Sequence, residues 1–277
     1  MDNLNELFYK KRQEKKMTLS TLAQISGLDR TTISRIEKGE REPTVRTAQL
    51  IAKGLGTNLS TLLMPLKNKP VIADTKFIRN EDKLKEYNLN KQDILGALNH
   101  VYETIAIIDS QLDTNNSPKL SSLVELANLS SIIGNLLGAG IVISSDGKFT
   151  RNAPHTYPDL LSTNRNYPDI EIKLALERNL PKGHLPKEGV HLMVRYVLTN
   201  DGVYTHGKDK RGDIIEIWEV KIGSLKESDF TFSSTVRDSG KTAYIKTSSL
   251  NQMTLIYYNP SLVPYKRAIT KEYSGFN

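Results

Sequence analysis

Cysteine is absent from the 277 residues of the chain. Disulfide bridges, thiolate zinc sites and cysteine nucleophiles are therefore excluded. The five histidines do not show the paired spacing of a zinc-protease helix. Any chemistry of this chain consequently depends on carboxylates, hydroxyls and amines.

Long apolar runs are missing as well. The longest apolar stretch, LLGAGIVI at 136–143, is much shorter than the ~20 residues that a membrane span needs. The first residues, MDNLNELFYKKRQEKK, lack the apolar segment of a signal peptide. We therefore expect a cytoplasmic protein that does not associate with a membrane.

Charge of one sign is only slightly in excess. The chain has 38 Lys and Arg residues against 31 Asp and Glu residues, a net charge of +7. Its hydrophobic content of 38% and charged content of 25% are typical of a soluble globular protein. The basic excess suits a polyanionic partner such as nucleic acid, without specifying one.

The hydrophobic pattern divides the chain into three parts. Residues 1–66 predict a compact set of short helices, and the polar, poorly periodic residues 67–92 predict a linker. In residues 93–277, two amphipathic helices come first, the second roughly from Lys119 to Leu137. From Gly140 onward the pattern predicts strands, among them GIVISSDGKF, DIEIK, VHLMVRYVLT, DIIEIWEVKIG and QMTLIYYN.

The segment TLSTLAQISGLDRTTISRIEKGEREP at 18–43 predicts two helices that meet at a sharp turn. Thr18 is suited to cap the first of them, and Gly27 tolerates the positive φ of such a turn. We expect Ile33 and Ile36 to face the core, beside Leu22 and Ile25. Polar side chains suited to a major groove then remain outside: Arg30, Thr31, Thr32, Ser34 and Arg35.

Together with the trailing LIAKGLGTNLSTLL, this segment resembles the phage-repressor (Cro/cI) type of helix-turn-helix domain. The resemblance implies that Arg30, Thr31 and Arg35 read bases and that Ser34 and Arg41 contact phosphates. The family often has a glutamine where this chain has Leu19. An excess of 12 basic over 7 acidic residues in 1–67 favours DNA. A helical bundle with an ordinary solvated face, or one used for protein contacts, is the alternative.

A second segment, YPDLLSTNRNYPDIEIK at 157–173, concentrates carboxylates. If DIEIK is a strand, Asp169, Glu171 and Lys173 share one face. Neighbouring carboxylates repel each other unless a cation lies between them, and hard divalent cations prefer such oxygens. Mg²⁺ also supplies the activated water and the charge neutralisation that phosphodiester hydrolysis requires.

The order Pro158-Asp159, eleven residues, then Glu171-Ile172-Lys173 resembles the PD-(D/E)XK motif of restriction-endonuclease-like nucleases. The resemblance implies that Asp159 and Glu171 bind Mg²⁺ and that Lys173 assists the attacking water. Glu125, on the preceding helix, and Asp169 are then candidates for an accessory acid.

Together the two resemblances imply a multi-domain protein. An all-α helix-turn-helix domain, 1–66, would precede an α/β restriction-endonuclease-like domain, 93–277, with a mixed central sheet. The implied function is a sequence-specific, Mg²⁺-dependent type II restriction endonuclease of double-stranded DNA. It would act as a homodimer, alongside a DNA methyltransferase that protects the host, and the helix-turn-helix would serve target recognition or autoregulation.

Other interpretations remain open. GDIIEIWEVK offers a rival acid set, Asp213 and Glu219 with Lys221, and charged residues on a half-exposed strand explain either set without catalysis. RDSGKTAYIKTSS at 237–249 is suited to DNA contact or to a solvated loop. The alternative function is a non-catalytic repressor with a C-terminal sensory or dimerisation domain. Self-cleaving phage repressors cut an Ala-Gly bond, which Ala139-Gly140 provides, but no convincing catalytic serine segment follows it.

Overall fold

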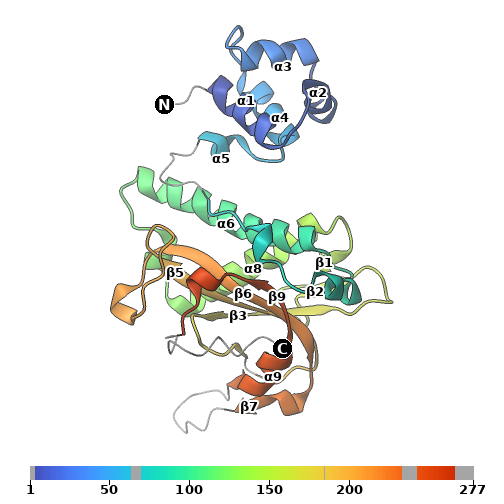
Figure 1. Cartoon of the computed structure of the whole chain (residues 1–277), viewed down its shortest axis with the longest axis vertical. Helices are drawn as coiled ribbons and strands as arrows, with labels where there is room; N and C mark the ends of the chain where they lie inside the picture. The colour runs from blue at the N-terminus through green and yellow to red at the C-terminus, as the bar shows by residue number, and fades with distance from the viewer. Residues whose placement is uncertain (1–3, 64–69, 184, 233–241, 266–277) are drawn as a thin grey trace. The chain divides into compact units, whose positions relative to one another are not determined.

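The computed structural model describes residues 4–63, 70–183, 185–232 and 242–265. The chain divides into two compact units, Met1–Lys69 and Pro70–Asn277 (Figure 1). Each unit has a hydrophobic core of its own. This division places residues 70–92 in the second unit.

In the first unit the structure describes five helices around one core. They are α1 (Leu4–Glu14), α2 (Leu19–Ser26), α3 (Arg30–Glu37), α4 (Val45–Gly54) and α5 (Leu59–Leu63). The fully buried core includes Phe8, Leu22, Ile33, Ile36 and Ile51. A bidentate ion pair joins α1 to α3, because the Arg12 guanidinium donates to both Glu37 oxygens at 2.8 and 2.7 Å.

The turn between α2 and α3 follows the expected local chemistry. Thr18 Oγ1 accepts a hydrogen bond from the Thr21 amide at 3.1 Å, and Gly27 has φ 67°. Asp29 caps α3 by accepting from the Thr32 amide at 3.0 Å. The expected burial of Ile25 is wrong: the residue is 57% exposed, because α2 turns the edge with Leu22 and Ser26 inward.

The second unit is built on a six-stranded mixed sheet of order β1-β2-β3-β5-β6-β9. Its strands are β1 (Phe149–Arg151), β2 (Leu160–Ser162), β3 (Ile170–Leu176), β5 (Gly189–Thr199), β6 (Ile214–Leu225) and β9 (Thr254–Tyr258). Strand β3 runs parallel to β5, and the other neighbours are antiparallel. Strands are thus present where DIEIK, VHLMVRYVLT, DIIEIWEVKIG and QMTLIYYN predicted them.

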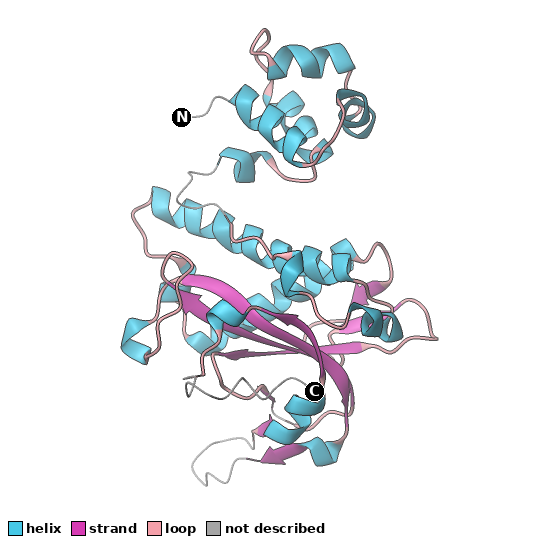
Figure 2. Ribbon diagram, viewed as in Figure 1, coloured by secondary structure: helices cyan, strands magenta, loops and turns pink. Residues whose placement is uncertain are grey.

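Two long helices cover one face of this sheet, α6 (Lys91–Thr114) and α8 (Leu126–Ser144) (Figure 2). The opposite side carries a three-stranded sheet of order β4-β8-β7, from Lys182–Gly183, Ala243–Ile245 and Phe230–Phe232. The remaining helices are short: α7 (Leu120–Leu123), α9 (Thr247–Gln252), and the 3-10 turns η2 (Thr75–Phe77), η3 (Glu81–Tyr87), η4 (Lys208–Lys210), η5 (Glu227–Asp229) and η6 (Pro260–Leu262).

Residues 70–92 are not the linker that their polarity predicted. Ala73, Leu84 and Leu89 are buried in the core of the second unit, and the Arg79 amide donates to the carbonyl of Ile256 at 2.8 Å. A few apolar residues anchor this segment to the core. The segment consists of short turns, which show no helical period in the sequence, and for that reason it resembled a linker. Of the expected linker, 67–69 lie outside the described residues.

The strand expected from Gly140 onward is also wrong. Helix α8 continues to Ser144, and only Phe149–Arg151 form β1. The glycines that suggested a break instead allow close packing: a Cβ at Gly140 would lie 2.8 Å from the Cα of Ala97 on α6. By length and composition α8 alone, among the described helices, passes as membrane-spanning. Core helices of soluble proteins pass the same test, and α8 packs against α6 and β3.

Candidate functional site

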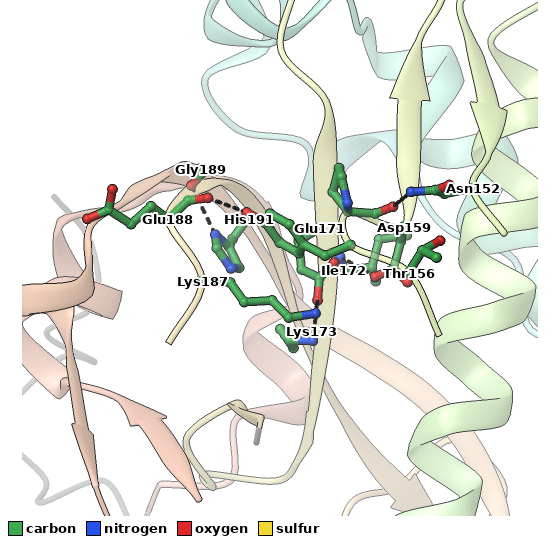
Figure 3. A network of polar contacts seen from close by, with 12 residues as sticks. Asn152, Thr156, Asp159, Glu171, Ile172, Lys173, Lys187, Glu188, Gly189 and His191 are labelled. Atoms are coloured by element: carbon green, nitrogen blue, oxygen red, sulfur yellow. Dashed lines mark hydrogen bonds and ion pairs between the residues drawn. The ribbon is translucent and has the colours of Figure 1, made fainter. Parts of the chain in front are cut away.

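The predicted acids come together where β2 and β3 pair. Asp159 directly precedes β2, whose Leu160 lies opposite Ile170 on β3. One Asp159 oxygen accepts a hydrogen bond from the Ile172 amide at 2.8 Å (Figure 3). Asp159 lies just before the first residue of β2, so this side-chain bond continues the pairing of the two segments past the start of the strand. It also holds the carboxylate beside Glu171.

Glu171 is buried, with a side chain 2% exposed, and two lysine ammonium groups lie next to it. Its Oε1 accepts from the Lys173 ammonium and lies 3.5 Å from that of Lys187. Its Oε2 is buried without a hydrogen-bond partner in the described part of the chain. A buried carboxylate oxygen without a partner is costly, so this atom is an acceptor available to a cation.

The electrostatics of the pair favour a cation between the two acids. Burial raises the pKa of Asp159, the Ile172 amide lowers it, and the charge of Glu171 raises it again. The charge of Glu171 therefore destabilises the ionised form of Asp159.

These residues fit a magnesium ion. Among the described residues no group of three or more acids or histidines is arranged to hold a metal. Mg²⁺ does not need such a group, since it is commonly held by one or two carboxylates together with waters and substrate phosphates. Asp159 and Glu171 would hold it, and the Glu171 oxygen without a partner supports the fit.

The two accessory acids lie elsewhere. Asp169 is exposed and accepts from the Ser162 amide at 2.7 Å, which fastens the turn between β2 and β3. Glu125 is exposed at the start of α8. Because Gly134 lies against Leu174 and Gly138 against Ile172, α8 runs opposite to β3. The structure thus places Glu125 beyond the far end of β3 from Glu171.

The rival acid set does not assemble. Asp213 precedes β6 and forms an ion pair with Lys119 at 2.9 Å. Glu219 is fully buried in the middle of the strand, where it pairs with Arg195. Lys221 is also fully buried and donates to the carbonyl of Leu250 at 3.1 Å. Glu219 and Lys221 thus belong to the buried interior of the sheet, whereas Asp213 lies apart from them.

Two further residues near the pair were not singled out from the sequence. Lys187 reaches Glu171 from the segment before β5, and no spacing rule connects the two positions. His191 lies opposite Glu171 in the β3–β5 register, and its Nδ1 is 3.0 Å from the Gly189 carbonyl. Burial lowers the pKa of His191 to about 4, so the ring is neutral at physiological pH.

The predicted DNA-reading residues lie on and after α3 of the first unit. Arg30, Thr31, Arg35 and Arg41 are exposed, while Thr32 and Ser34 are half-buried. Of the segment 237–249, residues 237–241 lie outside the described residues. The rest contributes β8 and the start of α9.

Comparison with known proteins identifies the first unit. The family model of the helix-turn-helix matches residues 8–62. The HTH-type transcriptional regulator SutR of Escherichia coli K12 is 30% identical, over 37% of this chain and 66% of the regulator's length. The solved restriction-modification controller protein C.Esp1396I is 41% identical over 21% of this chain and 77% of its own, with a TM-score of 0.21. Its tetramer in complex with a 35-base-pair operator has the same identity and TM-score and is covered to 78%.

Residues 8–62 thus form a helix-turn-helix DNA-binding domain, as the sequence predicted. This match ends before the second unit begins.

Proposed function

We propose that this chain, whose residues 8–62 form a helix-turn-helix DNA-binding domain, is a metal-dependent endonuclease of double-stranded DNA. One observation carries the proposal: Asp159 and Glu171, from neighbouring β-segments, lie side by side with Lys173. The mixed sheet that follows a long helix agrees with the restriction-endonuclease-like fold. The proposal includes a homodimer on a palindromic site and a methyltransferase that protects the host.

Each residue of the site has a distinct role. Asp159 and Glu171 hold the cation, which when bound supplies an activated water and neutralises phosphate charge. Lys173 forms an ion pair with Glu171, and its side chain is 26% exposed to solvent. In the proposed mechanism its ammonium therefore lies where a phosphate would approach the acids. There it orients the attacking water or a phosphate oxygen. The Ile172 amide holds Asp159 in position.

A non-catalytic regulator of transcription is the second candidate. It is supported by the likeness to a transcriptional regulator and to a restriction-modification controller protein. The self-cleaving version of this candidate is disfavoured. The Ala139-Gly140 bond lies inside helix α8, and Gly140 is packed against α6, whereas a protease needs an accessible, extended bond.

Incubation of supercoiled plasmid with the protein and Mg²⁺, or with EDTA, distinguishes the candidates. We expect cleavage with Mg²⁺ only. Glu171→Gln and Asp159→Asn should each lower the cleavage rate by about 100-fold or more, because each removes half of the charge that holds the cation. DNA affinity in EDTA should change little.

Asp169→Asn is the matched control, since it removes a neighbouring carboxylate that, in the described part of the chain, accepts a hydrogen bond from the Ser162 amide. It should leave cleavage nearly unchanged. Full activity of Glu171→Gln would end the nuclease proposal. Binding without cleavage by the unaltered protein, with Mg²⁺ or Mn²⁺, would favour the regulator.

A further inference from the structure

A pocket of about 310 Å³ opens beside the acid pair. It is lined by Lys173, Lys182, Gly183, Leu185 and Lys187. Among the described residues, the ion pairs of these three lysines involve one acid, Glu171, which contacts Lys173 and Lys187. The pocket therefore has an excess of positive charge that an anion would neutralise.

Two of these lysines, Lys173 and Lys187, are held in place by contacts with Glu171. Lys187 lies 3.5 Å from Glu171, and its ammonium sits 4.6 Å from the centre of the Tyr157 ring. Such a cation–π contact restricts a long side chain. Lys187 thus bridges the segment before Asp159 and the acid on β3, as Figure 3 shows for its approach to Glu171.

Strand β4 forms the other wall of the pocket. A Cβ at Gly183 would lie 3.6 Å from Cε and 4.0 Å from Nζ of Lys173. The missing side chain at this position therefore leaves room next to the ammonium of Lys173. The preceding residue, Lys182, is exposed and carries its ammonium 5.9 Å from the centre of the Tyr244 ring.

Lys182 also belongs to the polar face of the small sheet. Lys182 lies opposite Tyr244 on β8, and Tyr244 lies opposite Thr231 on β7. These side chains point away from Ala243 and Ile245, which are fully buried beneath the sheet. Lysine, tyrosine and threonine are side chains that contact phosphates in protein–DNA complexes.

We propose that this pocket binds a backbone phosphate next to the one that is cleaved, and that Lys182 and Lys187 position it. The inference rests on the proposed nuclease function, because the neighbouring phosphate matters only if Asp159 and Glu171 cut the strand. The ligand is a phosphodiester of DNA. A free phosphate has the same oxygens and is separated from it by the experiment.

The test uses the full chain with Lys182→Gln, Lys187→Gln and the double variant. Single-turnover cleavage of a duplex is measured against protein concentration at several salt concentrations. We expect the half-saturating concentration to rise about fivefold or more for each substitution. The salt slope should fall by about 0.9 for each phosphate that the variant no longer neutralises.

Lys208→Gln is the control, since Lys208 is exposed and lies on η4, outside the pocket. If the unaltered protein cleaves and the double variant has the half-saturation and salt slope of the control, the pocket inference is wrong and the nuclease proposal stands. If the unaltered protein does not cleave, the nuclease proposal is wrong. DNA affinity in EDTA then decides the pocket: an unchanged salt slope in the double variant overturns it, and a reduced slope retains it as a phosphate site.

Calorimetric titration with inorganic phosphate separates the two sources of the ligand. We expect no binding at millimolar phosphate, because a single backbone contact is weak outside the context of the duplex. Binding at micromolar phosphate that the double variant abolishes would assign the pocket to a free anion and overturn the backbone assignment.

Discussion

At the scale of single residues, Glu171 and His191 show how burial prepares the site. They lie opposite each other on β3 and β5, and each keeps one buried polar atom without a partner in the described part of the chain. The lysines that face them lower the pKa of His191 further, while burial is the larger cause. The site therefore stores unsatisfied polar groups that a bound cation or phosphate would satisfy.

The buried His191 predicts a pH dependence of stability. Its pKa is about 4 in the folded chain and about 6.5 in the unfolded chain, so its contribution is fully present above pH 6.5. It is lost as the pH falls toward 4, and the difference amounts to on the order of 3 kcal/mol. We expect His191→Asn to weaken the fall in unfolding free energy between pH 7 and pH 4.5, measured by urea denaturation.

His155→Asn is the control for this prediction. His155 is exposed and has φ 63°, a conformation that asparagine also tolerates. Its pH profile should match that of the unaltered protein. Equal profiles for all three proteins would show that His191 does not couple folding to protons.

At the scale of elements, α6 and α8 pack against each other and support the sheet that carries the site. Gly140 allows the two backbones to meet, because a Cβ there would lie 2.8 Å from the Cα and 2.9 Å from the carbonyl oxygen of Ala97. Backbone atoms have little freedom to move aside. Helix α8 also packs against β1 and β3.

Gly140→Ala should therefore destabilise the second unit. Alanine favours a helix over glycine by about 1 kcal/mol. Overpacking of a tight contact costs about 1–3 kcal/mol and should outweigh that gain. We expect a lower denaturant midpoint in urea unfolding followed by circular dichroism.

Ser131→Ala, on the exposed side of the same helix, should leave this midpoint nearly unchanged. A midpoint at or above that of the unaltered protein for Gly140→Ala would mean that α6 and α8 are not in contact at this residue.

At the scale of the whole molecule, the chain has two units with separate cores, and the proposal gives them different roles. The helix-turn-helix unit presents Arg35 and its neighbours, and the second unit presents the acid pair and the lysine pocket. The net charge of +7 gives the whole chain an attraction to DNA that does not depend on sequence. Recognition and chemistry should therefore be separable by substitution.

Arg35→Ala tests this separation. If Arg35 reads a base, its removal should weaken DNA affinity by about 1–3 kcal/mol in a gel shift. The single-turnover rate of cleavage at saturating DNA should stay unchanged, because Arg35 does not belong to the unit that holds the acids. An unchanged affinity would speak against base reading by α3, and a large fall in the saturated rate would show that the two units act as one.

Local patterns were sufficient to predict much of this molecule. Caps, the glycine turn and the apolar spacing of α2 and α3 identify the helix-turn-helix, since each depends on residues a few positions apart. The alternation of Asp169, Glu171 and Lys173 predicted a strand for the same reason. The pairing of Asp159 with Glu171 was also accessible, because a short turn leaves two neighbouring β-segments few other ways to meet.

Packing between distant segments decided the rest. From the sequence alone residues 70–92 resemble a linker, but Leu84 is buried in the core of the second unit. Likewise Gly140 resembles a helix end, but it is the point where α8 packs against Ala97 of α6. Lys187 pairs with Glu171, and Lys182 lines the neighbouring pocket, through the packing of separate segments that no spacing along the chain records. Residue order encodes short-range geometry directly, whereas contacts between segments exist only once the whole core has formed.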